Sequence, residues 1–422
     1  MHRFVVLCFS LMYGFLLSGG LLFQTLNGQT VTEIWNTGNS PLPGNEINCI
    51  ALDQSGIVWI GTESGLASFN GNNWEVFTTA NSPLTDHRIR SLGVDDQNRI
   101  WVGTFNGGLA LYDSGDWTTY TTANSGLPDN YVKSIAFDPD QRLWLGLSGG
   151  LASFDGTQWQ LFTATGAEVL LNNVNDVIFD LSKNIWVCTV NGGLVSMGKN
   201  DMLIAFNLAN SGVPDNTLLA ITSGTDNVKW MTTPTDGIGR YDGTLWQTFN
   251  TSNSGLASNL VTDIVAVPQN EAIYIGTTNA GLSIYHPPAN TWNNLTTGLP
   301  DLHITAIAAS EAASAGVNLW LGTNTGGLVL VNDNITSVNF PASHTFTPYP
   351  NPARHLVCLN LPPTASVVKA QVFPVASGNC VLETAPVNTN CFSVENLPDG
   401  LYFLRLWFDD GQSLVVRFAV LR

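Results

Sequence analysis

The chain has 422 residues, only 11% of them charged, and its formal net charge is −17. Residues 29–344 hold 27 acidic and 9 basic side chains, a net of −18, and such a field repels phosphate backbones and anionic headgroups. We therefore expect no nucleic-acid partner and no binding to an acidic membrane surface. Hydrophobic residues at 44% supply material for a packed core and argue against a disordered chain. The many Gly, Asn, Thr and Ser residues favour strands and turns, so we expect an all-β protein.

The N-terminus has the pattern of a secretory signal peptide. An apolar run over residues 4–23 follows Arg3, and it ends in Leu26-Asn-Gly-Gln29. We predict a signal peptide over residues 1–28, cleaved after Gly28, so that the mature chain has no transmembrane segment. The alternative is an uncleaved anchor helix, which the length of the run permits.

A repeated unit organises the next three hundred residues. It is clearest as Trp101-Val-Gly-Thr-Phe-Asn-Gly-Gly-Leu-Ala110. Its copies begin at Trp59, Trp101, Trp144, Trp186, Trp230, Tyr274 and Trp320. The spacings of 42, 43, 42, 44, 44 and 46 residues are typical of one four-stranded propeller blade. Seven copies predict a seven-bladed β-propeller over residues 29–340.

Each copy reads as four short strands. The first is apolar, the second carries the Trp-x-Gly-Thr run, the third follows Gly-Leu, and the fourth has the form Trp-x-x-aromatic. Asn-Gly or Asp-Gly turns after residues 69, 154 and 241 indicate hairpins between the third and fourth strands. The repeats lie near residues 47–88, 89–131, 132–173, 174–217, 218–260, 261–303 and 304–335.

The two ends of the array are complementary. Residues 33–42 match the end of a repeat, whereas the seventh copy runs out at Asp333 without a tryptophan-led fourth strand. We therefore expect the strand near residues 32–35 to complete the last blade. Such closure removes the open sheet edges that invite aggregation.

The repeat resembles a known family. Asp-x-x-Gly, then Leu-Trp-Ile-Gly-Thr, then Gly-Gly-Leu-x-x-Tyr is similar to the two-component-regulator propeller repeat, found in sensor regions of membrane-anchored hybrid histidine kinases. The resemblance covers about residues 47–333 and implies the propeller fold. The acidic turn is weak or missing in repeats five to seven, Cys188 replaces the repeat glycine, and no kinase segment follows.

Composition changes after a short linker at residues 341–345. Residues 346–422 alternate short apolar runs with Pro and Gly turns, which predicts a small β-sandwich. This module resembles the C-terminal sorting domain of the type IX (Por) secretion system of Bacteroidota. The residues that carry the resemblance are Tyr349, Pro350, Asn351, Pro352, Gly400 and Tyr402. The resemblance implies the secretion machinery as a partner and a secreted or outer-membrane surface location.

The cysteines show no Cys-x-x-Cys motif, so neither a zinc knuckle nor a redox site is indicated. Cys49 and Cys188 fall in strands of separate repeats, and we expect them to be buried small residues. Cys380 and Cys391 are a candidate disulfide across a hairpin, an open alternative to free thiols.

Few residues point to catalysis. Ser148 satisfies Gly-x-Ser-x-Gly, but that pattern needs a following helix, and here it fills a repeat turn. The histidines show no metal-ligand spacing; a site shared by His87 and His303 is the weaker alternative to ordinary loop residues. The repeated tryptophans and Asp53, Asp95, Asp138 and Asp180 fit packing and turn roles better than a sugar platform or a ligand set. We expect no catalytic residue, metal or cofactor.

Binding residues are expected on the face formed by the loops from strand two to three and from strand four to the next strand one. The least repeat-like side chains there are Glu46, Glu63, His87, Arg88, Phe105, Asn106, Tyr131, Asp236 and His303. We expect a monomeric, secreted, non-catalytic protein that binds a glycan or a protein. A polysaccharide lyase or hydrolase and an extracytoplasmic sensor component are the alternatives, and the absence of a convergent acid, base and nucleophile favours binding.

Overall fold

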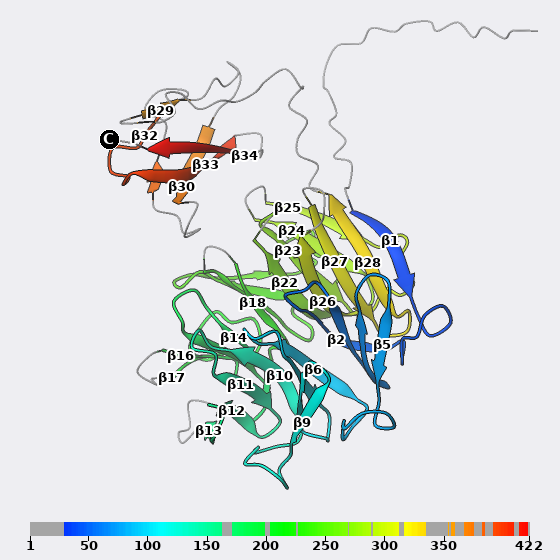
Figure 1. Ribbon diagram of the computed structural model, residues 1–422. Coiled ribbons are helices and arrows are strands. Elements are labelled where there is room, and N and C mark those ends of the chain that lie inside the picture. The colour runs from blue at the N-terminus through cyan, green and yellow to red at the C-terminus, as the bar shows by residue number, and fades with distance from the viewer. Residues whose placement is uncertain are drawn as a thin grey trace, which may run out of the picture.

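The fold is taken from a computed structural model (Figure 1). It describes residues 29–162, 171–198, 203–224, 227–268, 270–287, 290–311, 316–334, 353, 356–358, 367–374, 382–384, 391–408 and 413–420. The expected signal peptide, linker and Tyr349 to Pro352 motif lie outside these residues. All regular elements of the described part are β-strands, so no helix in it is long and apolar enough to cross a membrane.

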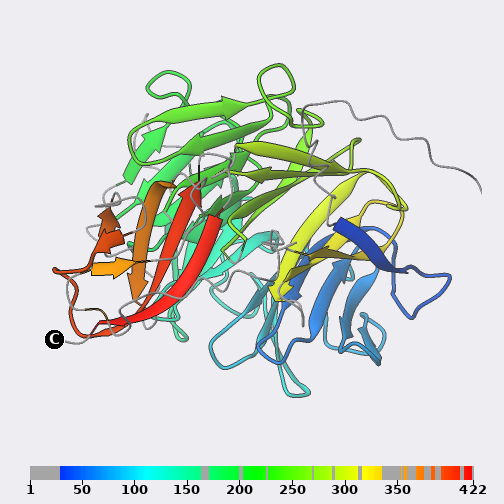
Figure 2. The same cartoon turned by 90° about the horizontal axis from the view of Figure 1, so that it is seen from above.

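Seven four-stranded sheets confirm the predicted propeller, and Figure 2 shows them from above. Blade 1 holds β2 (Ile47–Leu52), β3 (Val58–Thr62), β4 (Gly65–Phe69) and β5 (Trp74–Phe77). Blade 2 holds β6 (Ile89–Val94), β7 (Ile100–Thr104), β8 (Leu109–Asp113) and β9 (Asp116–Tyr120). Blade 3 holds β10 (Val132–Phe137), β11 (Leu143–Leu147), β12 (Gly150–Phe154) and β13 (Trp159–Phe162). Blade 4 holds β14 (Val174–Phe179), β15 (Ile185–Thr189), β16 (Leu194–Met197) and β17 (Leu203–Phe206).

The remaining blades follow the same order of antiparallel strands. Blade 5 holds β18 (Ile221–Ser223), β19 (Lys229–Thr232), β20 (Ile238–Tyr241) and β21 (Trp246–Phe249). Blade 6 holds β22 (Val261–Val267), β23 (Ala272–Thr277), β24 (Leu282–His286) and β25 (Thr291–Leu295). Blade 7 holds β26 (Ile304–Glu311), β27 (Gly316–Thr323), β28 (Leu328–Asn334) and β1 (Gln29–Trp35).

The first strand of the propeller completes its last blade. β1 pairs antiparallel with β28, from Gln29 opposite Asp333 to Trp35 opposite Leu328, in the register that the displaced repeat end requires. The Trp35 ring packs against Trp320 at 5.6 Å and Phe69 at 5.1 Å between ring centroids, and therefore joins blade 7 to blade 1. The side-chain amide of Gln29 donates to Asp333 at 2.8 Å.

Blades 1 to 4 share one buried device. The lead tryptophan of strand two donates its indole N–H to an aspartate six residues earlier: Trp59 to Asp53, Trp101 to Asp95, Trp144 to Asp138 and Trp186 to Asp180, at 2.8–3.1 Å. The other carboxylate oxygen of each aspartate accepts backbone N–H groups of the intervening turn, as in Ser55 and Ile57 onto Asp53. The aspartates thus hold the turn and the tryptophan together.

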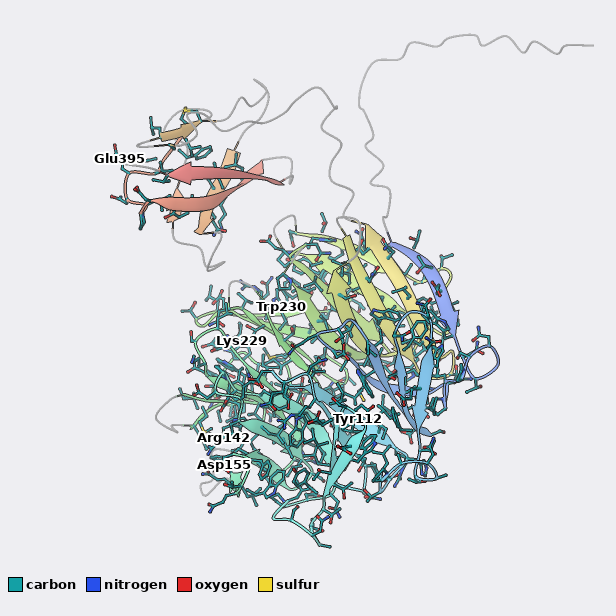
Figure 3. All side chains as sticks on the ribbon, in the orientation of Figure 1. Tyr112, Arg142, Asp155, Lys229, Trp230 and Glu395 are labelled. Carbon is teal, nitrogen blue, oxygen red and sulfur yellow. A yellow bond between two sulfur atoms is a disulfide. The ribbon has the colours of Figure 1, made fainter. Side chains whose placement is uncertain are left out.

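Blades 5 and 6, whose acidic turn is weak in the sequence, reach other partners. Lys229 of blade 5, next to Trp230 (Figure 3), is 3% exposed and lies 3.2 Å from Asp180 of blade 4. Tyr274 of blade 6 donates to the buried Asp333 of blade 7, which also holds Gln29. These two contacts cross blade boundaries, whereas the Trp–Asp bonds stay within a blade.

The C-terminal residues form two further sheets. A four-stranded sheet has the order β31 (Leu382–Thr384), β30 (Val367–Pro374), β33 (Gly400–Phe408) and β34 (Ser413–Val420). β29 (Leu356–Cys358) pairs with β32 (Cys391–Ser393). Both contribute to one apolar core that includes Val357, Phe392, Tyr402 and Leu404. The sandwich architecture of the whole module stays a prediction.

One cysteine prediction is wrong. Cys391 forms its disulfide with Cys358, its cross-strand neighbour in the β29–β32 pair, and not with Cys380, which lies outside the described residues. The long-range partner could not be chosen from sequence because strand pairing, and not chain proximity, brings the two sulfurs together. Cys188 is buried as expected, and Cys49 is half-buried.

Candidate binding site at the mouth of the ring

The loops that follow strand two and those that precede strand one meet on one face of every blade. In six blades a strand-two loop donates a backbone N–H to the carbonyl of the residue before strand one, as Phe105 does to Arg88 at 3.0 Å and Thr278 to Leu260 at 2.9 Å. Blade 5 has Pro234 at the donor position, and proline has no N–H. We call this end of the ring the mouth.

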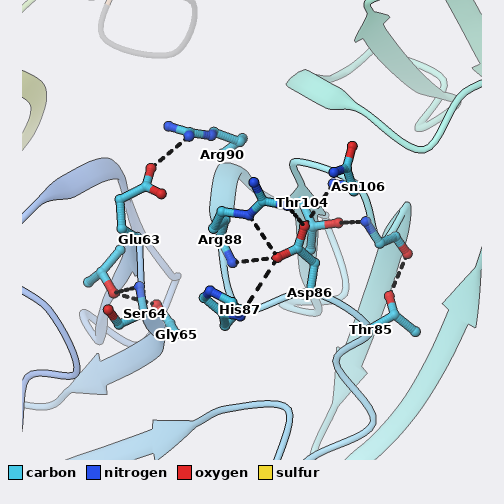
Figure 4. Close-up of polar contacts among 12 residues, drawn as sticks. Glu63, Ser64, Gly65, Thr85, Asp86, His87, Arg88, Arg90, Thr104 and Asn106 are labelled. Carbon is cyan, nitrogen blue, oxygen red and sulfur yellow. Dashed lines mark hydrogen bonds and ion pairs between the residues drawn. The ribbon is translucent and has the colours of Figure 1, made fainter.

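Six side chains of blades 1 to 3 are in contact at the mouth and are called the mouth cluster: Glu63, Asp86, Arg88, Arg90, Phe105 and Tyr131. Figure 4 shows the four charged members and their polar contacts. Arg88 donates to both carboxylate oxygens of Asp86, at 3.1 and 2.9 Å. Arg90 reaches Glu63 at 2.7 Å and Asn48 at 3.2 Å. Both guanidinium groups lie over the Phe105 ring, at 4.3 and 5.2 Å from its centroid.

Asp86 has a structural role. Partial burial works to raise its pKa, but hydrogen bonds from Arg88 and from the backbone N–H of Asn106 outweigh burial and hold the pKa below its usual value. Asp301 makes the equivalent bonds in blade 7, to His303 and Thr325. An ionised carboxylate occupied in this way is unsuited to act as a general acid.

An aromatic and cationic series continues from Phe105 into blade 3. The Phe105 and Tyr131 rings are 4.5 Å apart at 56°, and the Lys133 ammonium lies 5.4 Å from the Tyr131 centroid. Lys133 donates to the side-chain oxygens of Asn173 and Asn175. Burial lowers the pKa of Lys133, and the charge of nearby Asp129 opposes that shift.

The structure separates the nine predicted binding residues. Glu63, Arg88, Phe105 and Tyr131 belong to the mouth cluster; His87 and Asn106 are exposed beside it. Glu46 is exposed in blade 1 and is joined to Glu63 through backbone. Asp236 of blade 5 is exposed, and His303 of blade 7 is half-buried. Asp236 bonds Thr233 of its own blade and His303 bonds Asp301 of its own blade, and neither has a contact with the cluster among the described residues.

A second ring of residues, just inside the mouth, was missed by sequence reasoning. Six first strands carry a β-bulge after their first residue, which leaves the next residue unpaired and re-aims its side chain. We call these the belt residues, with Leu219 as the equivalent of blade 5: Asn48, Arg90, Lys133, Asn175, Leu219, Thr262 and Thr305. Aligning the repeats at this position would have exposed them.

Four belt residues each hydrogen-bond their own blade to the next one. Asn48 donates to the carbonyl of Ile89, and Asn175 to that of Leu218. Thr262 donates to Ile304 and Thr305 to Ile47, so the last of these bonds spans the closure of the ring. Arg90, Lys133 and Leu219 depart from the rule: the two cations donate to side chains, and leucine has no donor.

Two carboxylates follow the belt residues of blades 4 and 6. Asp176 accepts the backbone N–H of Ile221 in blade 5, and Asp263 accepts that of Ile307 in blade 7. Burial raises the pKa of Asp263 to about 6 against these hydrogen bonds, and burial also raises the pKa of Asp176. Each carboxylate therefore links two first strands at the cost of some desolvation.

The described residues hold no group of three or more His, Cys, Asp and Glu side chains placed to bind a metal ion. Ser148 lies in the turn between β11 and β12, and its backbone N–H bonds the Tyr131 carbonyl. A strand follows this serine, whereas a nucleophile elbow requires a helix. The arrangement of the mouth suits recognition of a ligand by fixed donors.

Two family models match the sequence. Residues 41–64, 83–106 and 126–149 match the two component regulator propeller, and residues 347–420 match the secretion system C-terminal sorting domain. The first model spans the mouth loops of blades 1 to 3. No curated protein matches the sequence.

Solved structures share the fold at low identity. PorZ, a surface component of the type-IX secretion system of Porphyromonas gingivalis, is 17% identical with a TM-score of 0.56, over 90% of this chain and 60% of PorZ. Virginiamycin B lyase of Staphylococcus aureus is 13% identical with a TM-score of 0.58, over 72% and 99%. The extracellular domain of BT4673 of B. thetaiotaomicron, designated a one component system, is 18% identical with a TM-score of 0.53, over 89% and 57%. The chain thus spans about three fifths of PorZ and of the BT4673 domain.

Proposed function

Because the chain carries two component regulator propeller repeats and a secretion system C-terminal sorting domain, we propose that it is an exported, non-catalytic binding protein. Residues 1–28 direct it across the inner membrane as a signal peptide. The module at residues 346–422 then directs it through the type IX machinery to the surface or the medium. The propeller, residues 29–340, binds an extracellular glycan or protein at its mouth.

One observation carries the binding role: the repeat pattern breaks at the mouth, and chiefly in blades 1 to 3. At the mouth positions blade 2 has Arg88, Arg90 and Phe105, and blade 3 has Tyr131 and Lys133. The equivalent positions of blades 4 to 6 hold uncharged residues. Departures from a structural rule on a rigid scaffold are where function is expected. The acids of the cluster are engaged by arginine or backbone N–H groups, which favours recognition over acid or base catalysis.

The export part is tested in a host that has a type IX system. Removing residues 414–422 deletes all of β34 except Ser413, and β34 is the edge strand of the four-stranded sheet. We expect the truncated chain to accumulate as a folded propeller in the periplasm, and the normally exported form to lack most of the module. Cell fractionation and mass spectrometry of the chain termini measure both. Normal export of the truncated chain contradicts the proposal.

A further inference from the structure

Three belt residues, Arg90, Lys133 and Leu219, donate no side-chain hydrogen bond to a backbone carbonyl of the next blade among the described residues, and they differ sharply in character. Arg90 and Lys133 come from neighbouring blades, and Leu219 comes from blade 5, two blades beyond Lys133. Asn or Thr occupies the belt position in the other four blades, so two cations and a leucine there are departures from the repeat. Their side chains are half-buried, so each still faces solvent at the inner rim.

The cationic side of the rim has donors to spare. Lys133 lies within ion-pairing distance of no carboxylate among the described residues, and its acceptors are two neutral amide oxygens. The Nε of Arg90 is buried and has no hydrogen-bond acceptor, although the ends of that guanidinium are bonded. That nitrogen is out of a ligand's reach, but the Arg90 side chain is 26% exposed, so its positive charge can attract a carboxylate at the rim.

The opposite side is apolar. Leu219 is the belt residue of blade 5, and Pro234 and Val190 hold in blades 5 and 4 the strand-two loop position that Phe105 holds in blade 2. In blade 6, Leu260 occupies the position that Arg88 and Tyr131 hold in blades 2 and 3, and it is 38% exposed. A hydroxyl-rich sugar gains little from leucine, and the Phe105 ring is already covered by Arg88 and Tyr131. The rim is therefore poorly suited to stacking a pyranose ring.

We infer that the mouth binds a polypeptide segment that presents a carboxylate beside an apolar side chain, the carboxylate at Lys133 and Arg90 and the apolar group at Leu219 and Leu260. This rests on the proposed binding function and specifies its ligand class. The carboxylate is that of a chain terminus or of an acidic side chain, since both offer the same acceptor chemistry.

The test uses the purified full chain and two displayed peptide libraries, one with free C-termini and one with the random segment internal. Enriched peptides are then titrated against Lys133→Met, Leu219→Asn and two matched controls on the opposite end of the ring, Lys183→Met and Leu181→Asn. Both control residues lie in the exposed turn between β14 and β15. Thermal melts confirm that every variant folds.

We expect peptides that combine an acid with an apolar residue, bound about tenfold more weakly by Lys133→Met and about fivefold more weakly by Leu219→Asn. The controls should change affinity less than about twofold. Enrichment from the first library alone assigns the carboxylate to a chain terminus. Equal loss of peptide affinity in the control variants, or no peptide enriched by the wild-type chain over Lys133→Met, overturns the inference.

A glycan array probed in parallel separates the two proposals. Glycan binding at the mouth overturns the peptide inference and keeps the binding function, whereas binding to neither class of ligand removes both.

Discussion

Replacing Trp35 by alanine should release the strand that closes the ring. Trp35 lies on β1, which is joined to blade 7 only by non-covalent contacts, and its ring packs against Trp320, Phe69 and Trp74. Each aromatic pair contributes about 1 kcal/mol, so the three together give about 3 kcal/mol. These pair energies add to the burial of a half-buried ring, so the total cost should lie within the roughly 3–5 kcal/mol range for truncating a buried aromatic residue.

Phe206→Ala is the matched control. Phe206 holds the equivalent position in blade 4, is half-buried, and also has three ring neighbours: Trp186, Tyr241 and Trp246. Its strand β17 belongs to a blade built from consecutive strands. The two substitutions should therefore cost similar free energies of unfolding, but their local effects should differ.

Hydrogen exchange measured by mass spectrometry distinguishes them. In Trp35→Ala, peptides that cover residues 29–35 and 328–333 should exchange faster than any others, because β1 can leave β28 without breaking a blade hairpin. In Phe206→Ala the loss of protection should stay in blade 4 and its neighbour. If Trp35→Ala loosens the whole ring evenly, or leaves residues 328–333 as protected as before, the account of closure is incorrect.

Four other outcomes are expected. Asp180→Asn should lower the free energy of unfolding by about 3 kcal/mol, because it removes the carboxylate that pairs with the buried Lys229. In urea titrations the double variant Asp180→Asn/Lys229→Met should recover part of that loss. Equal stability of the single and double variants would contradict this. The pKa of Asp263 is about 6 in the folded state against about 4 unfolded, so the native state gains a proton between pH 7 and 5. This group should therefore make the protein about 1 kcal/mol more stable at pH 5 than at pH 7. Asp263→Asn should abolish that gain in unfolding curves measured at both pH values. Replacing Cys358 and Cys391 by serine should cost the C-terminal module about 3 kcal/mol, seen as faster proteolysis within residues 391–408, and unchanged cleavage would argue against a stabilising disulfide. Ser148→Ala should leave any hydrolytic activity of the chain unchanged, and a specific loss in the folded variant would favour the enzyme alternative.

The fold could be predicted because its signal repeats. Each blade restates the same Trp-led strand and Gly turn, so errors in one copy are corrected by the other six. The displaced end at residues 33–42 also identified the strand that pairs with β28. One repeat pattern thus predicted seven sheets, and the missing fourth strand of the last copy predicted the closure.

The site was harder because its residues matter through contacts between blades. Phe105 and Tyr131 were chosen as unusual loop residues, but Arg90 and Lys133 look like ordinary polar positions in strands. The direction of their side chains depends on the β-bulge, which cannot be predicted from the residue pattern of one strand. Asp333 likewise gave no signal, since its partners Tyr274 and Gln29 lie 59 and 304 residues away.

The pairing of β1 with β28 also determines when the propeller can be finished. β1 is the first strand of the array to leave the ribosome, yet its partner β28 is the last, about three hundred residues later. While the chain is being made, six blades can form from consecutive hairpins, and β1 stays unpaired until β28 is complete. Ring completion is therefore a late, high-contact-order event, and an interrupted chain cannot present a closed propeller.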